Sequence, residues 1–258
     1  MIPYVTIPPV AIGPLAINAF RTLVLLGVVV SYLVFLRRAD RQGIARQQAK
    51  SFFVAGLLSA FLMAHVGKLV LYSPGLLATD PLSLLRPFDG LSSFGGVAGA
   101  CAGARIWQKI THYPGRKFPE LIDAALYAFP FGWLPGRLAC AVSHDHLGRL
   151  TDHWLGVQYP GGMRWNLGML EALFIAGLAA LFWRLGRRPR PRWFFGALFC
   201  LSYAPFRFLL DSLHESAPRL AFNLSVDQTC SLALAAMGII YIAVTRRTDR
   251  WTHHGVIS

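Results

Sequence analysis

The chain has 258 residues, of which 55% are hydrophobic and only 14% are charged. Soluble domains carry about 25% charged residues, so this composition excludes a water-soluble surface. A formal net charge of +13 would suggest nucleic acid as the partner of a soluble protein. In a membrane protein the same excess reflects basic residues beside the cytoplasmic ends of spans, so we expect no nucleic-acid partner.

Seven apolar segments follow one another along the chain, each close to the roughly 20 residues that cross a bilayer. We therefore predict an all-α integral membrane protein of about seven transmembrane helices, organised as a single polytopic membrane domain over residues 1–258. The spans are predicted over residues 15–36, 51–73, 91–108, 119–142, 167–185, 192–211 and 227–245. No basic residue precedes the first of them, so we expect it to stay in the membrane and not to be removed as a signal peptide.

The third and fourth predicted spans contain residues that alter helix packing or geometry. Pro130 and Pro135 lie in the fourth span and predict a kink or a break there. The third span is rich in glycine, at Gly95, Gly96, Gly99 and Gly103. Small residues allow close helix approach in lipid, which favours a packing role over the alternative of a backbone cradle for phosphate.

Most of the 25 basic residues follow the first, third, fifth and seventh predicted spans. With seven spans these short loops all lie on one side, and the positive-inside rule places that side in the cytoplasm. The topology predicted is N-terminus out and C-terminus in.

A reporter fused after Arg250 tests this topology, because that position follows the last span. We expect a reporter that works only in the cytoplasm to be active and one that works only outside to be inactive. The opposite pattern would contradict the predicted orientation.

The informative basic residues are those that lie within or at the ends of apolar spans, above all Arg137 and Arg207. An arginine at mid-bilayer costs at least about 2.5–3.5 kcal/mol, so such residues face a protein interior or an aqueous cavity and have a partner. Asp145, Glu171 and Asp211 are also expected near the outer surface. Two arginines and three carboxylates thus predict one outward-facing pocket.

Two guanidinium groups in a pocket suit a phosphate diester, whose oxygens match their paired N–H donors. The carboxylates would hold the arginines in place while the pocket is empty. The alternative is that Arg207 and Asp211, four positions apart on one helix face, form a purely structural pair.

A polar loop with the sequence SHDHLGRLTDHW follows the fourth span. Histidine and aspartate are zinc ligands, but their spacing here is irregular and matches no zinc motif. We therefore interpret it as a polar interfacial loop, and we expect neither a metal nor a cofactor.

The chain resembles the bacterial phosphatidylglycerol–prolipoprotein diacylglyceryl transferases through nearly its whole length. IGPLAIN and LRRADRQG are similar to that family's first helix and turn, and LLRPFDGLSSFGG to a stretch ending in His-Gly-Gly. GRLACAVSHDHLGRLTD is similar to the family signature, RWNLGMLEALF to the start of a Glu-bearing helix, and SYAPFRFLLDSLHE to an arginine-bearing helix. Gln228 and the apolar segment after it look like the last element.

The resemblance implies a multi-pass enzyme of the bacterial inner membrane. Such an enzyme moves the diacylglyceryl group of phosphatidylglycerol to the lipobox cysteine thiol of a preprolipoprotein, and glycerol phosphate leaves. It implies phosphate-handling roles for Arg137 and Arg207. The substrate-binding positions that it suggests are Gly95, Gly96, Gly136, Asp145, Gly148, Glu171 and Asp211.

Several positions depart from the family pattern. The family's histidine before Gly-Gly is Phe94, an asparagine is Cys140, and a first-helix tyrosine is Phe20. Asp145 and Asp211 replace glutamates.

The acceptor must still lose its thiol proton, because the thiolate is the nucleophile. His144 and His146 stand next to Arg137 in the outer loop, so we hypothesise that one of them is the base. The alternative is that both are solvated loop residues.

The departures leave two further functions open. The first is a non-catalytic paralogue that binds an anionic phospholipid or a lipobox segment. The second is a metal-dependent lipid phosphatase built on the His-Asp loop.

Overall fold

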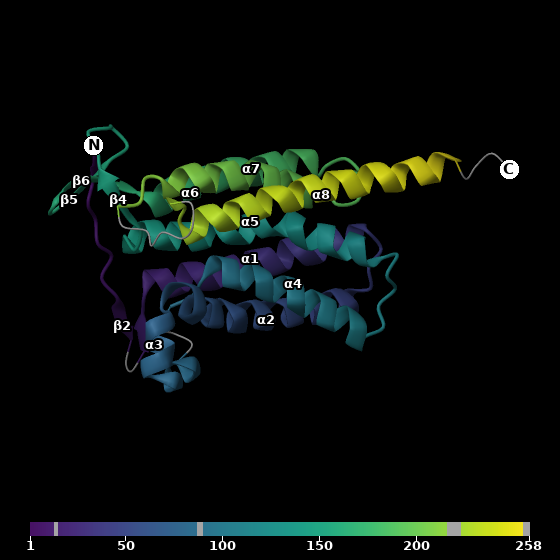
Figure 1. The fold of residues 1–258 in the computed structure, drawn as a ribbon, viewed down its shortest axis with the longest axis horizontal. Helices are drawn as coiled ribbons and strands as arrows, with labels where there is room; N and C mark the ends of the chain where they lie inside the picture. The colour runs from purple at the N-terminus through teal and green to yellow at the C-terminus, as the bar shows by residue number, and fades with distance from the viewer. Residues whose placement is uncertain (13–14, 87–89, 216–222, 255–258) are drawn as a thin grey trace. The chain divides into compact units, whose positions relative to one another are not determined.

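The computed structural model describes residues 1–12, 15–86, 90–215 and 223–254. A long helix occupies each of the seven segments predicted as spans (Figure 1). These helices are α1 (Ala19–Arg41), α2 (Arg46–Tyr72), α4 (Ser93–Ile110), α5 (Phe118–Ser143), α6 (Leu167–Leu185), α7 (Phe194–Asp211) and α8 (Val226–His254). Helix α3 (Pro74–Thr79) and the 3-10 helix η1 (Pro81–Leu85) follow α2.

Within the described part of the chain, 5 helices are long and apolar enough to cross a membrane. They are α1, α2, α6, α7 and residues 226–243 of α8. Helices α4 and α5 occupy the other two predicted segments, but α4 is glycine-rich and α5 carries Glu120, Asp123 and Arg137. The chain is thus a multi-pass membrane protein, and the count of seven spans stays a prediction.

Short strands that the sequence analysis did not predict lie outside the helices. One sheet has the order β1 (Ile2–Pro3), β5 (Val157–Tyr159), β6 (Gly162–Asn166) and β4 (Leu147–Leu150). A separate hairpin pairs β2 (Val10–Ile12) with β3 (Leu15–Ile17).

The hairpin corrects the predicted start of the first span, because residues 15–17 belong to β3. The side-chain Oδ1 of Asn18 accepts a hydrogen bond from the amide of Phe20 at 2.7 Å, and its carbonyl accepts one from the amide of Thr22 at 3.1 Å. Helix α1 therefore begins at Ala19.

The chain divides into two compact units, Met1–Arg38 with Asp123–Ser258 (unit 1) and Ala39–Ile122 (unit 2). In unit 2, α2 and α4 pack through glycine. A methyl group on Gly99 would lie 2.4 Å from the carbonyl oxygen of Ser59, and one on Gly95 would lie 2.5 Å from that of Met63. This close approach supports the predicted packing role of the glycine-rich span.

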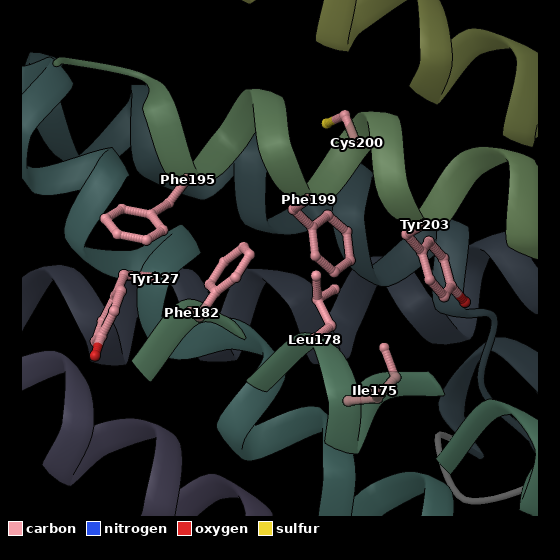
Figure 2. Close-up of a cluster of buried hydrophobic side chains, with 8 residues drawn as sticks. All are labelled: Tyr127, Ile175, Leu178, Phe182, Phe195, Phe199, Cys200 and Tyr203. Carbon is pink, nitrogen blue, oxygen red and sulfur yellow. The ribbon is translucent and has the colours of Figure 1, made fainter. Parts of the chain in front are cut away.

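In unit 1, an aromatic and aliphatic cluster joins α5, α6 and α7 (Figure 2). Its buried members are Tyr127, Ile175, Leu178, Phe182, Phe195, Phe199, Cys200 and Tyr203. Helix α5 runs through Pro130 and Pro135 without interruption, so no break occurs there and the kink stays a prediction. The cluster fixes these three helices beside one another and thereby sets the spacing of the polar groups at their ends.

Candidate functional site

Polar side chains gather at one end of unit 1. Helices α5 and α7 finish at this end, α6 and α8 begin there, and strands β4 to β6 lie beside it (Figure 1). Arg137 lies near the end of α5, Glu171 near the start of α6, Arg207 near the end of α7 and Asp227 in the first turn of α8. Groups from four helices can therefore meet there.

Glu171 is the centre of this group, and its side chain is 1% exposed. Arg137 contacts it through Nε at 2.9 Å, and Arg207 through Nη1 at 3.4 Å. The hydroxyl of Tyr203 donates a hydrogen bond to the same carboxylate. A buried carboxylate is strongly unfavourable unless it is paired and hydrogen-bonded, so these donors account for its burial.

Each arginine has a further partner of its own. The guanidinium carbon of Arg137 lies 5.1 Å from the centre of the Trp133 ring, one helical turn earlier on α5. Arg207 forms an ion pair through Nη2 with Asp227. The structure thus brings the two predicted arginines onto one carboxylate and adds a second carboxylate to Arg207.

Asp211 and Asp145 make contacts other than the ion pairs described for Arg137 and Arg207. Asp211 is buried and accepts a hydrogen bond from the hydroxyl of Ser225, whereas the ion pairs described for Arg207 go to Glu171 and Asp227. Asp145 is exposed and lines a cavity of about 300 Å³. That cavity lies between the start of α1 and the end of α5, and its lining includes Asn18, Phe20, Arg21 and Ser143.

His144 holds the N-terminal segment against the sheet. Its Nε2 lies 3.1 Å from the carbonyl oxygen of Val5, so Nε2 carries the proton and donates it. Its Nδ1 then accepts from the hydroxyl of Tyr159 at 2.9 Å and from the side-chain amide of Asn166 at 3.1 Å. Burial raises the pKa of Tyr159, which keeps that hydroxyl protonated as a donor. Both ring nitrogens of His144 are therefore engaged.

Asn166 fixes this arrangement because its own orientation is set by two other contacts. Its side-chain oxygen caps α6 by accepting from the amide of Met169 at 2.9 Å, and its side-chain nitrogen donates to the carbonyl of Ala141 at 2.9 Å. The φ angle of His144 is +57°, a left-handed conformation that few non-glycine residues adopt. His144 thus holds a constrained position.

His146 differs from its neighbour because its side chain retains access to solvent. Partial desolvation by the surrounding protein, followed by the positive charges of Arg137 and Arg207, lowers the pKa of His146. Its imidazole is therefore neutral at physiological pH and lies within electrostatic range of the arginine pair.

The predicted glycines have different surroundings. Gly148 is enclosed: a methyl group there would lie 2.7 Å from the Cβ of Trp165. Gly136 has open space where a side chain would be, and Gly96 has only ordinary contacts. Gly95 and Gly96 belong to unit 2.

Among the residues with a described position, no three or more histidine, cysteine, aspartate or glutamate side chains form an arrangement that could hold a metal ion.

Tyr203 and Asp227 are site residues that were not predicted from the sequence. Tyr203 precedes Arg207 by one helical turn, so the i, i+4 spacing could have placed both on the same face. Asp227 is an acidic residue in the first turn of an apolar helix, and a lone carboxylate there also predicts a functional or paired group.

A protein-family model described as "Prolipoprotein diacylglyceryl transferase" matches residues 9–244. The chain belongs to this family. It is 30% identical over 258 residues to the phosphatidylglycerol–prolipoprotein diacylglyceryl transferase of Chromohalobacter salexigens. The aligned region covers 96% of this chain and 96% of the relative.

Other relatives with the same name agree with this assignment. The Vibrio campbellii protein is 29% identical over 90% of this chain and 87% of its own length. The Vibrio cholerae protein is 30% identical over 89% of this chain and 88% of its own length.

Proposed function

We propose that this protein transfers the diacylglyceryl group of phosphatidylglycerol to the lipobox cysteine thiol of a prolipoprotein. The main support is that Arg137 from α5 and Arg207 from α7 both contact the buried carboxylate of Glu171, in a membrane protein that belongs to this family. Relatives that match about nine-tenths of the chain or more bear the name of this transferase. No observation favours the non-catalytic alternative.

The proposed reaction exchanges one bond to a glycerol carbon for another. The acceptor thiolate attacks the carbon that bears the phosphate, the carbon–oxygen bond breaks, and glycerol phosphate leaves with the bonding electrons. Negative charge on the departing phosphate increases along the way. Arg137 and Arg207 are suited to stabilise it because guanidinium groups donate paired hydrogen bonds to phosphate oxygens.

The membrane topology fits this role if the arginine end of unit 1 faces outward. We propose seven spans with the N-terminus outside and the C-terminus inside, in the bacterial inner membrane. Arg137, Glu171, Arg207 and Asp227 all lie at one end of their helices, so this orientation places them near the outer leaflet. Phosphatidylglycerol and the membrane-anchored acceptor could then both reach them from the lipid.

His146 is the base that this geometry favours. The Nδ1 atom of His144 already lies against the Tyr159 hydroxyl and the Asn166 side-chain amide, so these groups occupy the position that an acceptor thiol would need. His146 has a lowered pKa, an accessible ring and two arginines within electrostatic range. We assign the acceptor thiol proton to His146 and a positioning role to His144.

Replacing an arginine tests the proposed phosphate role. We expect Arg137→Lys and Arg207→Lys each to lower kcat for peptide lipidation by about 100-fold or more, because lysine cannot reproduce a paired donor. The assay uses purified protein, phosphatidylglycerol and a lipobox peptide, with Arg86→Lys as the control on the exposed ion pair with Asp80. Unchanged transfer in both variants would refute the proposal, and lipid binding by the wild type without turnover would support a non-catalytic protein.

The pH profile tests the histidine assignment. The wild-type kcat/KM should fall in acid as His146 gains a proton, and the lowered pKa places this fall below the usual histidine range. His146→Gln should lower kcat by roughly 100-fold or more and should lack this acid limb. His144→Gln should retain the limb, because His144 does not take the proton. An acid limb that persists in His146→Gln and disappears in His144→Gln would reverse the assignment.

A further inference from the structure

Arg207 is held by two carboxylates that come from different helices. Its Nη1 lies 3.4 Å from Oε2 of Glu171 on α6, and its Nη2 pairs with Oδ2 of Asp227 on α8. Both terminal nitrogens of the guanidinium group therefore have an anionic partner before any substrate is bound. A lipid phosphate that binds Arg207 end-on, through Nη1 and Nη2 together, therefore competes with these two carboxylates for the same nitrogens.

The two carboxylates differ in how readily they can be displaced. The Glu171 side chain is 1% exposed and also binds Arg137 and the hydroxyl of Tyr203. Moving it would leave several buried polar groups without their partner, which is strongly unfavourable. The Asp227 side chain is 16% exposed, and the Arg207 side chain beside it is 17% exposed. Asp227 is therefore the partner at the accessible side of the guanidinium group.

Asp227 also lies where a negative charge is stabilised by something other than Arg207. It lies in the first turn of α8, where the free backbone N–H groups and the helix dipole favour a negative charge. A phosphate oxygen can replace a carboxylate oxygen at Nη2 because both are anionic acceptors.

We infer that Asp227 is a displaceable counter-ion that occupies Arg207 in the empty site and yields it to the lipid phosphate. This positioning role rests on the proposed function, because it assumes that Arg207 binds the phosphate. Asp227 competes directly with the substrate and so weakens phosphatidylglycerol binding. It also disfavours neutral ligands, since only an anion compensates Arg207 for the carboxylate it loses.

Asp227→Asn separates this role from a purely structural one. It keeps the side-chain shape but removes the competing charge, so the KM for phosphatidylglycerol should fall by about five-fold or more, without a rise in kcat. The variant should unfold at a lower temperature than the wild type without lipid. Added phosphatidylglycerol should raise its unfolding temperature by more than it raises that of the wild type. Asp227→Glu should restore the wild-type KM.

Glu215→Gln is the matched control, because it removes a carboxylate from an exposed ion pair with Arg164. It should leave the KM and the unfolding temperature unchanged. An unchanged or raised KM in folded Asp227→Asn would overturn the inference. If that variant does not fold, Asp227→Ser replaces it with the same expected fall in KM. Failure of both to fold, even with phosphatidylglycerol present, would show a structural requirement and would also overturn it.

The Arg207→Lys result distinguishes this inference from the function on which it rests. An active Arg207→Lys enzyme would remove the phosphate role itself. An inactive Arg207→Lys enzyme together with a normal KM in Asp227→Asn would leave the proposed function intact and refute only the role of Asp227.

Discussion

The rest of the site depends on one buried negative charge, the carboxylate of Glu171. A membrane protein can keep such a group inside a helix bundle only if donors surround it. Here the donors come from the end of α5 and the end of α7, and Glu171 itself comes from the start of α6. One carboxylate thus fixes the relative positions of Arg137 and Arg207, which lie far apart in the sequence.

The ion pairs that stabilise the empty site also determine that its ligand must be an anion. In the empty site Arg137 and Arg207 each have a carboxylate partner, so neither of these two cations is buried unpaired. A lipid phosphate must compete with carboxylates for the guanidinium groups, and the more exposed Asp227 is easier to replace than Glu171. The ion pairs therefore maintain the geometry and at the same time restrict binding to ligands that bring a negative charge.

The sequence predicted the helices well because a helix that crosses lipid needs apolar side chains toward the lipid as well as toward its neighbours, which leaves a continuous apolar run in the sequence. It also predicted Arg137, Glu171 and Arg207, because a charge within an apolar run requires a partner. The strands β1 and β4 to β6 could not be predicted in this way, since none is longer than 5 residues and such short segments carry too little pattern.

Partner choice was the least predictable feature of the site. Asp211 follows Arg207 by one helical turn, yet the described ion pairs of Arg207 reach Glu171 and Asp227 on other helices. Nothing in the sequence separates His144 from His146, because both lie in the same short loop after α5. In the structure, the left-handed backbone at His144 directs its ring to Tyr159, Asn166 and Val5. Both distinctions arise from tertiary packing, which a single sequence does not contain.

A double-mutant cycle on Arg137 and Arg207 tests the central claim most directly, because Glu171 is proposed to link them. The binding free energy of phosphatidylglycerol is measured for each arginine-to-lysine variant and for the double variant, with Glu171 present and again with Glu171→Gln. We predict a coupling energy between the two arginines of about 1 kcal/mol or more with Glu171 and close to zero with glutamine. Additive effects of the two arginines in the presence of Glu171 would contradict the account.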